Sequence, residues 1–125
     1  MRYMFLVTQT KGGQPPQALI DAMEEARKQA VSDGGMISTG GLAPAEQSAR
    51  ATVRGGNLTV KDGPFAEAKE LVGGYAIMEH PTREAAVEAG RWLMEMHQKY
   101  WPGWEGWVDV RQVFEAAETP HPALG

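Results

Sequence analysis

The chain contains no cysteine among its 125 residues. This absence excludes disulfide bonds, iron–sulfur clusters, thiolate zinc sites and a cysteine nucleophile. No apolar run approaches the roughly 20 residues of a membrane-spanning helix. The apolar run from Tyr3 to Val7 is also too short for a secretion signal. We therefore expect a cytoplasmic protein with no membrane partner.

Positive charge is scarce as well. The chain has 12 Lys and Arg against 16 Asp and Glu, which gives a net charge of −4. Nucleic-acid-binding domains usually carry a basic stripe, so nucleic acid is not an expected partner. Only three histidines are present, and none has a metal-ligand spacing to another histidine or to a carboxylate. We expect no metal and no cofactor.

The remaining composition is that of one globular domain. Hydrophobic residues make up 42% of the chain and charged residues 22%. A domain of this length buries roughly two thirds of its unfolded surface, so it needs no covalent staples. We expect a single domain over residues 1–115. Residues 116–125 contain two prolines and no periodicity, which predicts a loose tail.

Glycine and proline divide the chain into predicted elements. Two helices are predicted, Gln17–Ser32 and one opened by Pro81-Thr82-Arg83-Glu84. Gly55-Gly56-Asn57 predicts a hairpin turn. Gly73-Gly74 predicts either a bulge or a close approach of two backbones, with room left at a cleft floor. The predicted strands are, in chain order, Tyr3–Gln9, Met36–Leu42, Arg50–Arg54 and Leu58–Lys61 of the hairpin, Leu71–Glu79, and Trp107–Phe114.

Each predicted helix carries one apolar stripe at helical spacing. In the first helix the stripe is Leu19, Ile20, Met23, Ala26, Ala30 and Val31. In the second helix it is Ala85, Ala89, Trp92, Leu93 and Met96. We expect these two stripes to face the sheet.

The element order is β-α-β, a hairpin, then β-α-β. This order predicts an α+β fold, a ferredoxin-like split βαβ with an antiparallel sheet and two helices on one face. The second face of such a sheet would expose a large apolar patch if it stayed uncovered. Pairing two sheets across a two-fold axis covers it, so we expect a homodimer.

The most specific stretch runs from Lys61 to Glu70 and reads KDGPFAEAKE. It resembles the DGPF signature of the YCII-related domain family, often written DGPFAETKE, from which only Ala68 departs. Three other segments also resemble that family: Arg2-Tyr3-Met4, Thr39-Gly40-Gly41-Leu42 and Val108-Asp109-Val110-Arg111. A fourth segment, residues 97–106, is similar to one carried by some members. The resemblance covers residues 1–115, the expected domain.

The resemblance implies a dimeric α+β barrel built from ferredoxin-like halves, with a poorly defined biochemical role. Some relatives use a His–Asp pair in a cleft, and one removes chloride from a chlorinated hydroxyquinol. Many members with the DGPF signature are associated with extracytoplasmic-function sigma factors. The first helix carries the histidine in relatives with the pair. Here that helix has no histidine, and Met23 lies near the corresponding position.

Three residues are candidates for catalysis. Asp62 would act as acid or base, while Lys69 or His97 would steady developing negative charge. Asp62 also has a purely structural interpretation, because Asp-Gly-Pro is strong turn chemistry. His97 lies at the end of the second helix, where a cation favours the helix dipole. His80 is expected to be exposed.

Five residues are candidate ligand contacts: Phe65, Glu67, Glu70, Tyr75 and Trp101. Each group also has an interpretation without a ligand. Phe65 would plug the core under the turn, and Glu67, Lys69 and Glu70 would form solvated ion pairs. Trp101 belongs to an aromatic run, residues 100–107, whose rings would pack on the helix end or across a dimer.

Two functions follow from these residues. The first is a homodimeric module that binds a small molecule or regulates a partner. The second is a small lyase or isomerase, similar to a dehydrochlorinase, that uses Asp62 with Lys69 or His97 at a dimer cleft. The missing histidine of the first helix favours the first function.

Overall fold

A computed structural model describes residues 1–64 and 71–115 of the chain. Its elements are, in order, β1 (Arg2–Lys11), α1 (Gln17–Ser32), β2 (Met36–Gly41), a short 3-10 turn (Ala45–Gln47), β3 (Ala49–Arg54), β4 (Asn57–Asp62), β5 (Leu71–Glu79), α2 (Arg83–Tyr100) and β6 (Glu105–Val113). No helix in the described part is long and apolar enough to cross a membrane. The candidates Phe65, Glu67, Lys69 and Glu70 lie outside the described residues.

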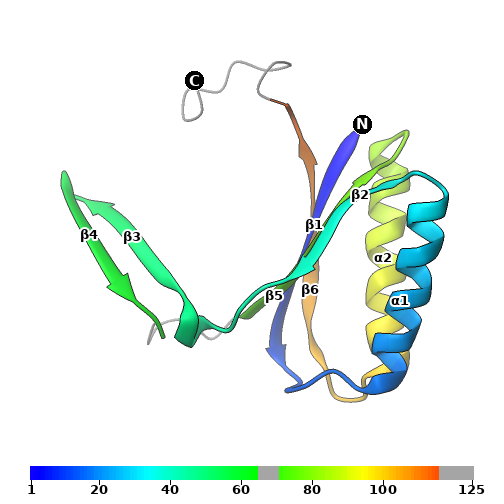
Figure 1. Ribbon diagram of the computed structural model, residues 1–125, viewed down its shortest axis with the longest axis horizontal. Helices are drawn as coiled ribbons and strands as arrows, with labels where there is room; N and C mark the ends of the chain where they lie inside the picture. Colours follow the sequence, from blue (N-terminus) through cyan, green and yellow to red (C-terminus); the bar gives the residue numbers. More distant parts are fainter. Residues whose placement is uncertain (65–70, 116–125) are drawn as a thin grey trace.

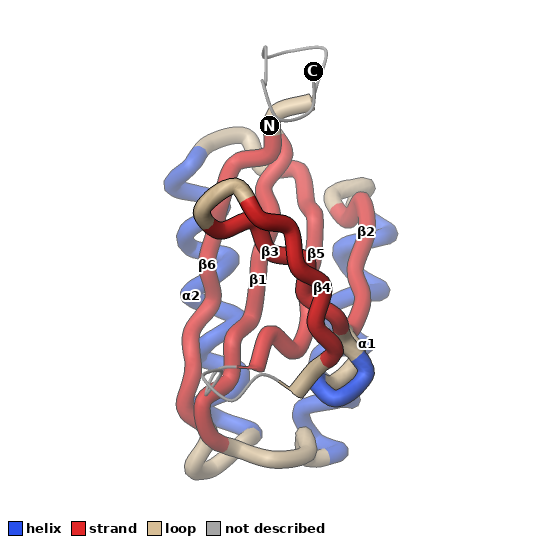
Figure 2. The backbone as a smooth tube through the Cα atoms, turned by 90° about the vertical axis from the view of Figure 1, so that its left-hand side faces the viewer, coloured by secondary structure: helices blue, strands red, loops and turns tan. Residues whose placement is uncertain are grey.

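Four strands form one antiparallel sheet in the order β2-β5-β1-β6. Helices α1 and α2 lie together on one face of this sheet (Figure 1). This is the predicted α+β, ferredoxin-like arrangement. Strands β3 and β4 pair only with each other, and they extend from the opposite side of the sheet (Figures 1 and 2).

The core is centred on β1, which pairs along most of its length with β5 on one side and with β6 on the other. Alternation along β1 directs Tyr3 and Phe5 toward the helices, where both are buried with Ala86 of α2. Arg2, at the start of the same strand, pairs with Glu79 of β5 in register, and their side chains form an ion pair of 2.9 Å. The sheet therefore depends on contacts between residues that are 77 positions apart in the sequence.

The two glycine predictions are confirmed. Gly55 and Gly56 have φ angles of 57° and 79°, as a two-residue hairpin turn requires. The β1–β5 register shifts where Val7 faces Gly74 and Thr8 faces Val72, so Gly73 is the extra residue of a bulge.

The predicted helix stripes are only partly correct. The residues of α2 that are buried are Ala86, Gly90 and His97, whereas Trp92 is 43% exposed. A hydrophobicity pattern misses this face because a small residue and an imidazole contribute little to it. In α1 only Leu19 is buried, while Ile20 and Val31 are exposed.

His80 also differs from its expected exposure. Its ring is half-buried between β5 and α2, 5.8 Å from the ring centre of Phe5 in an edge-on arrangement. Burial and the charge of the N-terminal amine lower the pKa of His80. The helix after it begins as predicted, because the Thr82 hydroxyl accepts a hydrogen bond from the Ala85 amide.

Gly106 provides a test of how β6 is seated. A Cβ atom at this position would lie 2.2 Å from the Thr8 carbonyl oxygen and 2.6 Å from the Trp104 ring. We predict that Gly106→Ala lowers the free energy of unfolding by about 1–3 kcal/mol, because the backbone of β1 cannot yield without loss of pairing. Chemical denaturation measures this difference.

Gly73→Ala is the matched control. A Cβ atom at Gly73 meets nothing within 4 Å, and its φ is ordinary. Equal losses of stability in the two variants would contradict the close approach at Gly106.

Candidate functional site

A cavity of about 820 Å³ lies between the sheet and the two helices. It exists because α1 buries only Leu19 against the rest of the fold, which leaves space beneath the other residues of its inner face. The volume falls in the range of small-molecule sites, about 300–1,000 Å³. Most of the lining is apolar, and it includes Phe5, Val7, Leu19, Met23 and Leu93.

One wall of the cavity is made of glycine. Gly40 and Gly41 of β2 and Gly73 and Gly74 of β5 all line it, and without side chains they leave its volume open. Tyr75 follows them in β5, pairs with Gly40, and is a lining residue. It lies opposite Leu6 in the β1–β5 register, so alternation directs its ring toward the sheet face that is turned away from the helices. A Cβ atom at Gly40 would lie 3.0 Å from the Tyr75 ring, so glycine is needed where this ring crosses β2.

The polar end of the cavity is His97, near the end of α2. Only 7% of the residue is exposed. Its ring lies 4.5 Å from the ring centre of Trp104 and 6.2 Å from that of Trp101, with which it is stacked. Nδ1 is 2.8 Å from the backbone carbonyl oxygen of Leu93.

This hydrogen bond fixes the chemistry of the imidazole. A carbonyl oxygen can only accept, so Nδ1 of His97 donates and carries the proton. Burial lowers the pKa of His97 below its usual value near 6.5, with the Leu93 bond acting weakly in the other direction. At neutral pH the ring is therefore uncharged, and Nε2 is an unprotonated acceptor on a residue that lines an apolar cavity.

Two indoles hold this end of the cavity together. The Trp101 Nε1–H donates to the Gly12 carbonyl oxygen, and the Trp104 Nε1–H donates to the Gln9 side-chain oxygen, each over 3.2 Å. The Gln9 amide in turn donates to the Gly13 carbonyl oxygen over 3.2 Å. The aromatic run thus ties the loop after α2 to the end of β1. The indoles of Trp101 and Trp104 thus pack at the end of α2, as one interpretation of the aromatic run predicted. Both residues also line the cavity.

A family model for the YCII-related domain matches residues 1–93 of this chain. The chain belongs to the YCII-related domain family. The match runs from β1 into α2, so it covers α1, the glycine wall and Tyr75. His97 and Trp101 follow the matched range. No curated protein matches the chain.

In this YCII-related chain, the sequence candidates separate into two groups. His97, Tyr75 and Trp101 line the cavity together. Asp62 lies at the exposed end of β4, where it pairs with Ala49, and it is not among the lining residues. Within the described part of one protomer, Asp62 is therefore not part of the cavity that His97 lines.

Gln9 was not among the sequence candidates, and Trp104 was included only as part of the aromatic run, residues 100–107. The signal in the sequence was weak, because Gln9 lies between two threonines in β1 and its partly buried amide needs a hydrogen-bond partner that the sequence does not identify. Its partner, Trp104, lies 95 positions further along the chain. The sequence does not contain the register that brings them together.

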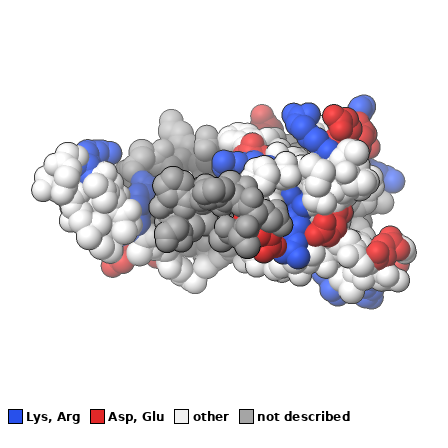
Figure 3. Space-filling model, turned by 90° about the horizontal axis from the view of Figure 1, so that it is seen from above, with Lys and Arg blue, Asp and Glu red and all other residues white. Residues whose placement is uncertain are grey.

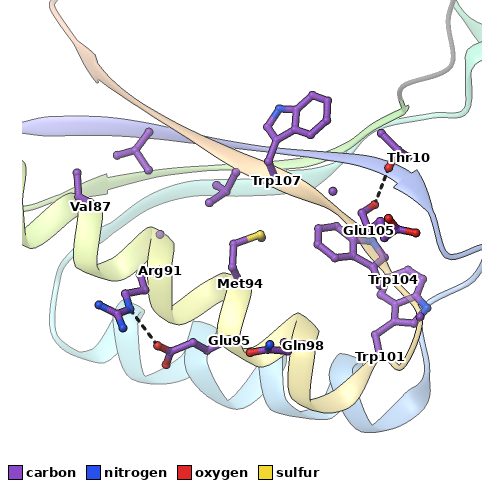
Figure 4. A pocket seen from close by; sticks show the side chains of 15 residues that line it. Thr10, Val87, Arg91, Met94, Glu95, Gln98, Trp101, Trp104, Glu105 and Trp107 are labelled. Carbon is purple, nitrogen blue, oxygen red and sulfur yellow. Dashed lines mark hydrogen bonds and ion pairs between the residues drawn. The ribbon is translucent and has the colours of Figure 1, made fainter.

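A second, more open groove of about 1050 Å³ lies between α2 and the outer edge of β6 (Figure 4). Its charged residues on α2, Arg91 and Glu95, are exposed and already paired with each other at 3.2 Å. Trp107 points away from α2, toward the other face of the sheet (Figure 4). Neither groove nor cavity holds a metal-binding set, because no cluster of three His, Asp or Glu residues occurs in the described ranges 1–64 and 71–115.

The lowered pKa of His97 predicts a pH-dependent stability. The unfolded chain takes up the proton more readily than the folded chain, so stability is complete above the unfolded pKa, near 6.5, and is lost as pH falls below it. We predict that the free energy of unfolding decreases between pH 7.5 and 5.5, above the range where carboxyl groups titrate. Denaturant titrations at each pH measure it.

The variant His97→Phe keeps a ring beside the two indoles but cannot be protonated. In this variant the free energy of unfolding should depend less on pH. Burial lowers the pKa of His80 as well, so adding His80→Phe should remove the pH dependence that persists. A wild-type protein equally stable across this pH window would contradict the assignment.

Proposed function

We propose that this protein binds a small, mainly apolar molecule that carries one hydrogen-bond donor, in the cavity between its sheet and helices. The observation that supports this is His97, a buried neutral imidazole at the end of a cavity of about 820 Å³. Sites for small molecules usually combine an apolar lining with a few placed polar groups. The lining here has that character, with Nε2 as the acceptor and the indoles as flat walls.

The proposal includes a homodimer formed through the face of the sheet opposite the helices. Alternation along β1 places Met4 and Leu6 on that face, and Ile77 is the neighbour of Met4 on β5. Trp107, 38% exposed, points the same way (Figure 4). An apolar face of this extent is favoured to pack against a second copy of itself.

The resemblance to DGPF-type members supports a regulatory version of the same proposal. A protein that reports a metabolite to a partner, such as an extracytoplasmic-function sigma factor, needs a cavity that the metabolite can fill. The small-molecule site and the regulatory association are therefore compatible expectations.

The alternative is an enzyme that transfers a proton, the lyase or isomerase type. One observation favours it, namely that His97 is uncharged at neutral pH and so is able to act as a base. In this version Asp62 and Lys69 would have to reach the cavity from the segment that follows β4 or from a second protomer. Catalysis would then be lost in Asp62→Asn, whereas simple ligand binding would persist in that variant.

Filling the cavity tests the binding site. Ala26 lines the cavity from α1, and Ala18 is exposed on the same helix outside it. With 2-naphthol as the probe, we predict at least about a 10-fold loss of affinity in Ala26→Trp, because the added indole occupies the space that the probe needs. Ala18→Trp should change affinity less than about 2-fold. Isothermal titration calorimetry measures both, with circular dichroism as the check on folding.

The acceptor role of His97 is tested with a pair of probes. 2-Naphthol can donate a hydrogen bond, while 2-methylnaphthalene has similar size and cannot. Because one hydrogen bond contributes about 1 kcal/mol, His97→Phe should weaken 2-naphthol about 5-fold and leave 2-methylnaphthalene unchanged. If His97→Phe lost the same affinity for both probes, His97 would not be the hydrogen-bond acceptor of the site.

A further inference from the structure

The hairpin β3–β4, residues Ala49–Asp62, is called the arm below. Its register gives it two unlike faces. One face carries the pairs Ala49/Asp62, Ala51/Val60 and Val53/Leu58, and the other carries Arg50/Lys61, Thr52/Thr59 and Arg54/Asn57. The arm is therefore apolar on one side and basic and polar on the other.

The apolar face of the arm is open to solvent within one protomer. Val53, Leu58 and Val60 are 72%, 69% and 71% exposed. A two-stranded hairpin is at best marginally stable in water, and it needs a further strand or a packed face to persist. At the root of the arm, the Gly63 amide donates to the Ser48 carbonyl oxygen over 2.7 Å. Its apolar face thus calls for a surface that one described protomer does not provide.

The position of the arm indicates where that surface is. The arm leaves the fold on the side of the sheet that faces away from the helices (Figures 1 and 2). That is the side on which Met4, Leu6, Ile77 and Trp107 lie. The arm therefore projects toward the space that a second protomer would occupy if it packed on this face of the sheet.

Charge favours the same occupant. Residues 49–62 contain three basic side chains and one acidic side chain, a net charge of +2. The whole chain has a net charge of −4, so the remaining residues carry −6. Basic side chains appear on the arm in Figure 3, at the left, while both signs occur over the helices and sheet. A basic arm is attracted to the acidic body of another copy.

The area of the sheet alone is small for a stable dimer. Four strands at the usual spacing offer a face of about 450 Å² on each protomer, and the arm adds about 200 Å². Each arm also covers about 200 Å² of the partner, so two sheet faces and two arms would bury about 1,700 Å² in a dimer, which is within the range of stable interfaces of about 1,200–2,000 Å². Without the arms the interface falls below that range.

We propose that the arm is a dimer clamp, in which the apolar face of each arm packs on the other copy of the chain. This inference rests on the homodimer of the proposed function, and it adds the segment that makes the dimer stable. By two-fold symmetry both arms act in the same way, so a change in the arm acts twice in each dimer.

The test compares two neighbouring positions on β4. Val60→Lys places a charge on the apolar face, and Thr59→Lys places the same charge on the opposite face. We expect Val60→Lys to raise the dimer dissociation constant about 100-fold, since each of two equivalent contacts loses about a factor of ten. Thr59→Lys should stay within about 3-fold of wild type. Sedimentation velocity over a range of concentrations measures all three proteins.

Each outcome decides one point. A wild-type chain that is monomeric at micromolar concentration overturns both the dimer and the clamp. A dimer that Val60→Lys leaves intact, or that both variants weaken equally, overturns the clamp alone. Ligand binding in the cavity is measured separately with 2-naphthol, so failure of the clamp and failure of the small-molecule site are distinguishable.

Cross-linking gives a second, independent measurement. Because the chain has no cysteine, Leu58→Cys provides a unique attachment point for a benzophenone maleimide on the apolar face. In a mixture of ¹⁴N- and ¹⁵N-labelled protein, a clamp gives cross-links that join the two isotopes. Cross-links confined to one isotope would mean that the arm folds on its own protomer, which contradicts the clamp. Asn57→Cys, on the basic face, is the control and should give few cross-links between copies.

Discussion

The close seating of α2 on the sheet determines much of this structure. At Ala86 and Gly90 the helix has almost no side chain, and a Cβ atom at Gly90 would lie 2.8 Å from Val110 of β6. About two turns further along the helix, large rings take over, and the His97 ring lies beside the indoles of Trp101 and Trp104. The helix is thus close to the sheet in its middle and propped by rings at its end, which positions His97 at the cavity.

The contrast between the two helices explains the cavity. Helix α2 buries three residues, whereas α1 buries only Leu19. The inner face of α1 bears medium and small side chains, such as Met23, Ala26 and Ala30, and it faces strands that are rich in glycine. Small groups on both sides leave a space that neither layer fills, and that space is where a ligand would lie.

The sequence was sufficient for the elements and their order. Gly55 and Gly56 marked the hairpin turn, because few other residues adopt their positive φ angles. Gly73 marked the bulge for a different reason, since glycine interrupts a strand pattern. It was not sufficient for the site, since Gln9 and Trp104 meet only through the β1–β6 register. The buried face of α2 was missed for a related reason, as Ala86 and Gly90 bury little area and give a weak hydrophobic signal. The candidates Tyr75, His97 and Trp101 were placed together by the fold, while Asp62 stays on the arm.

The central place of β1 has a consequence for biosynthesis. This strand is made early, yet its neighbours on both sides, β5 and β6, are made much later, and Thr10 bonds to the Glu105 carbonyl 95 positions away. The sheet cannot close until the last strand has left the ribosome, so β1 waits as an unpaired apolar segment during translation. Such long-range pairing slows folding and exposes nascent chains to aggregation. The strand order thus sets how late in synthesis β1 can find both of its partners, whatever ligand the finished protein takes.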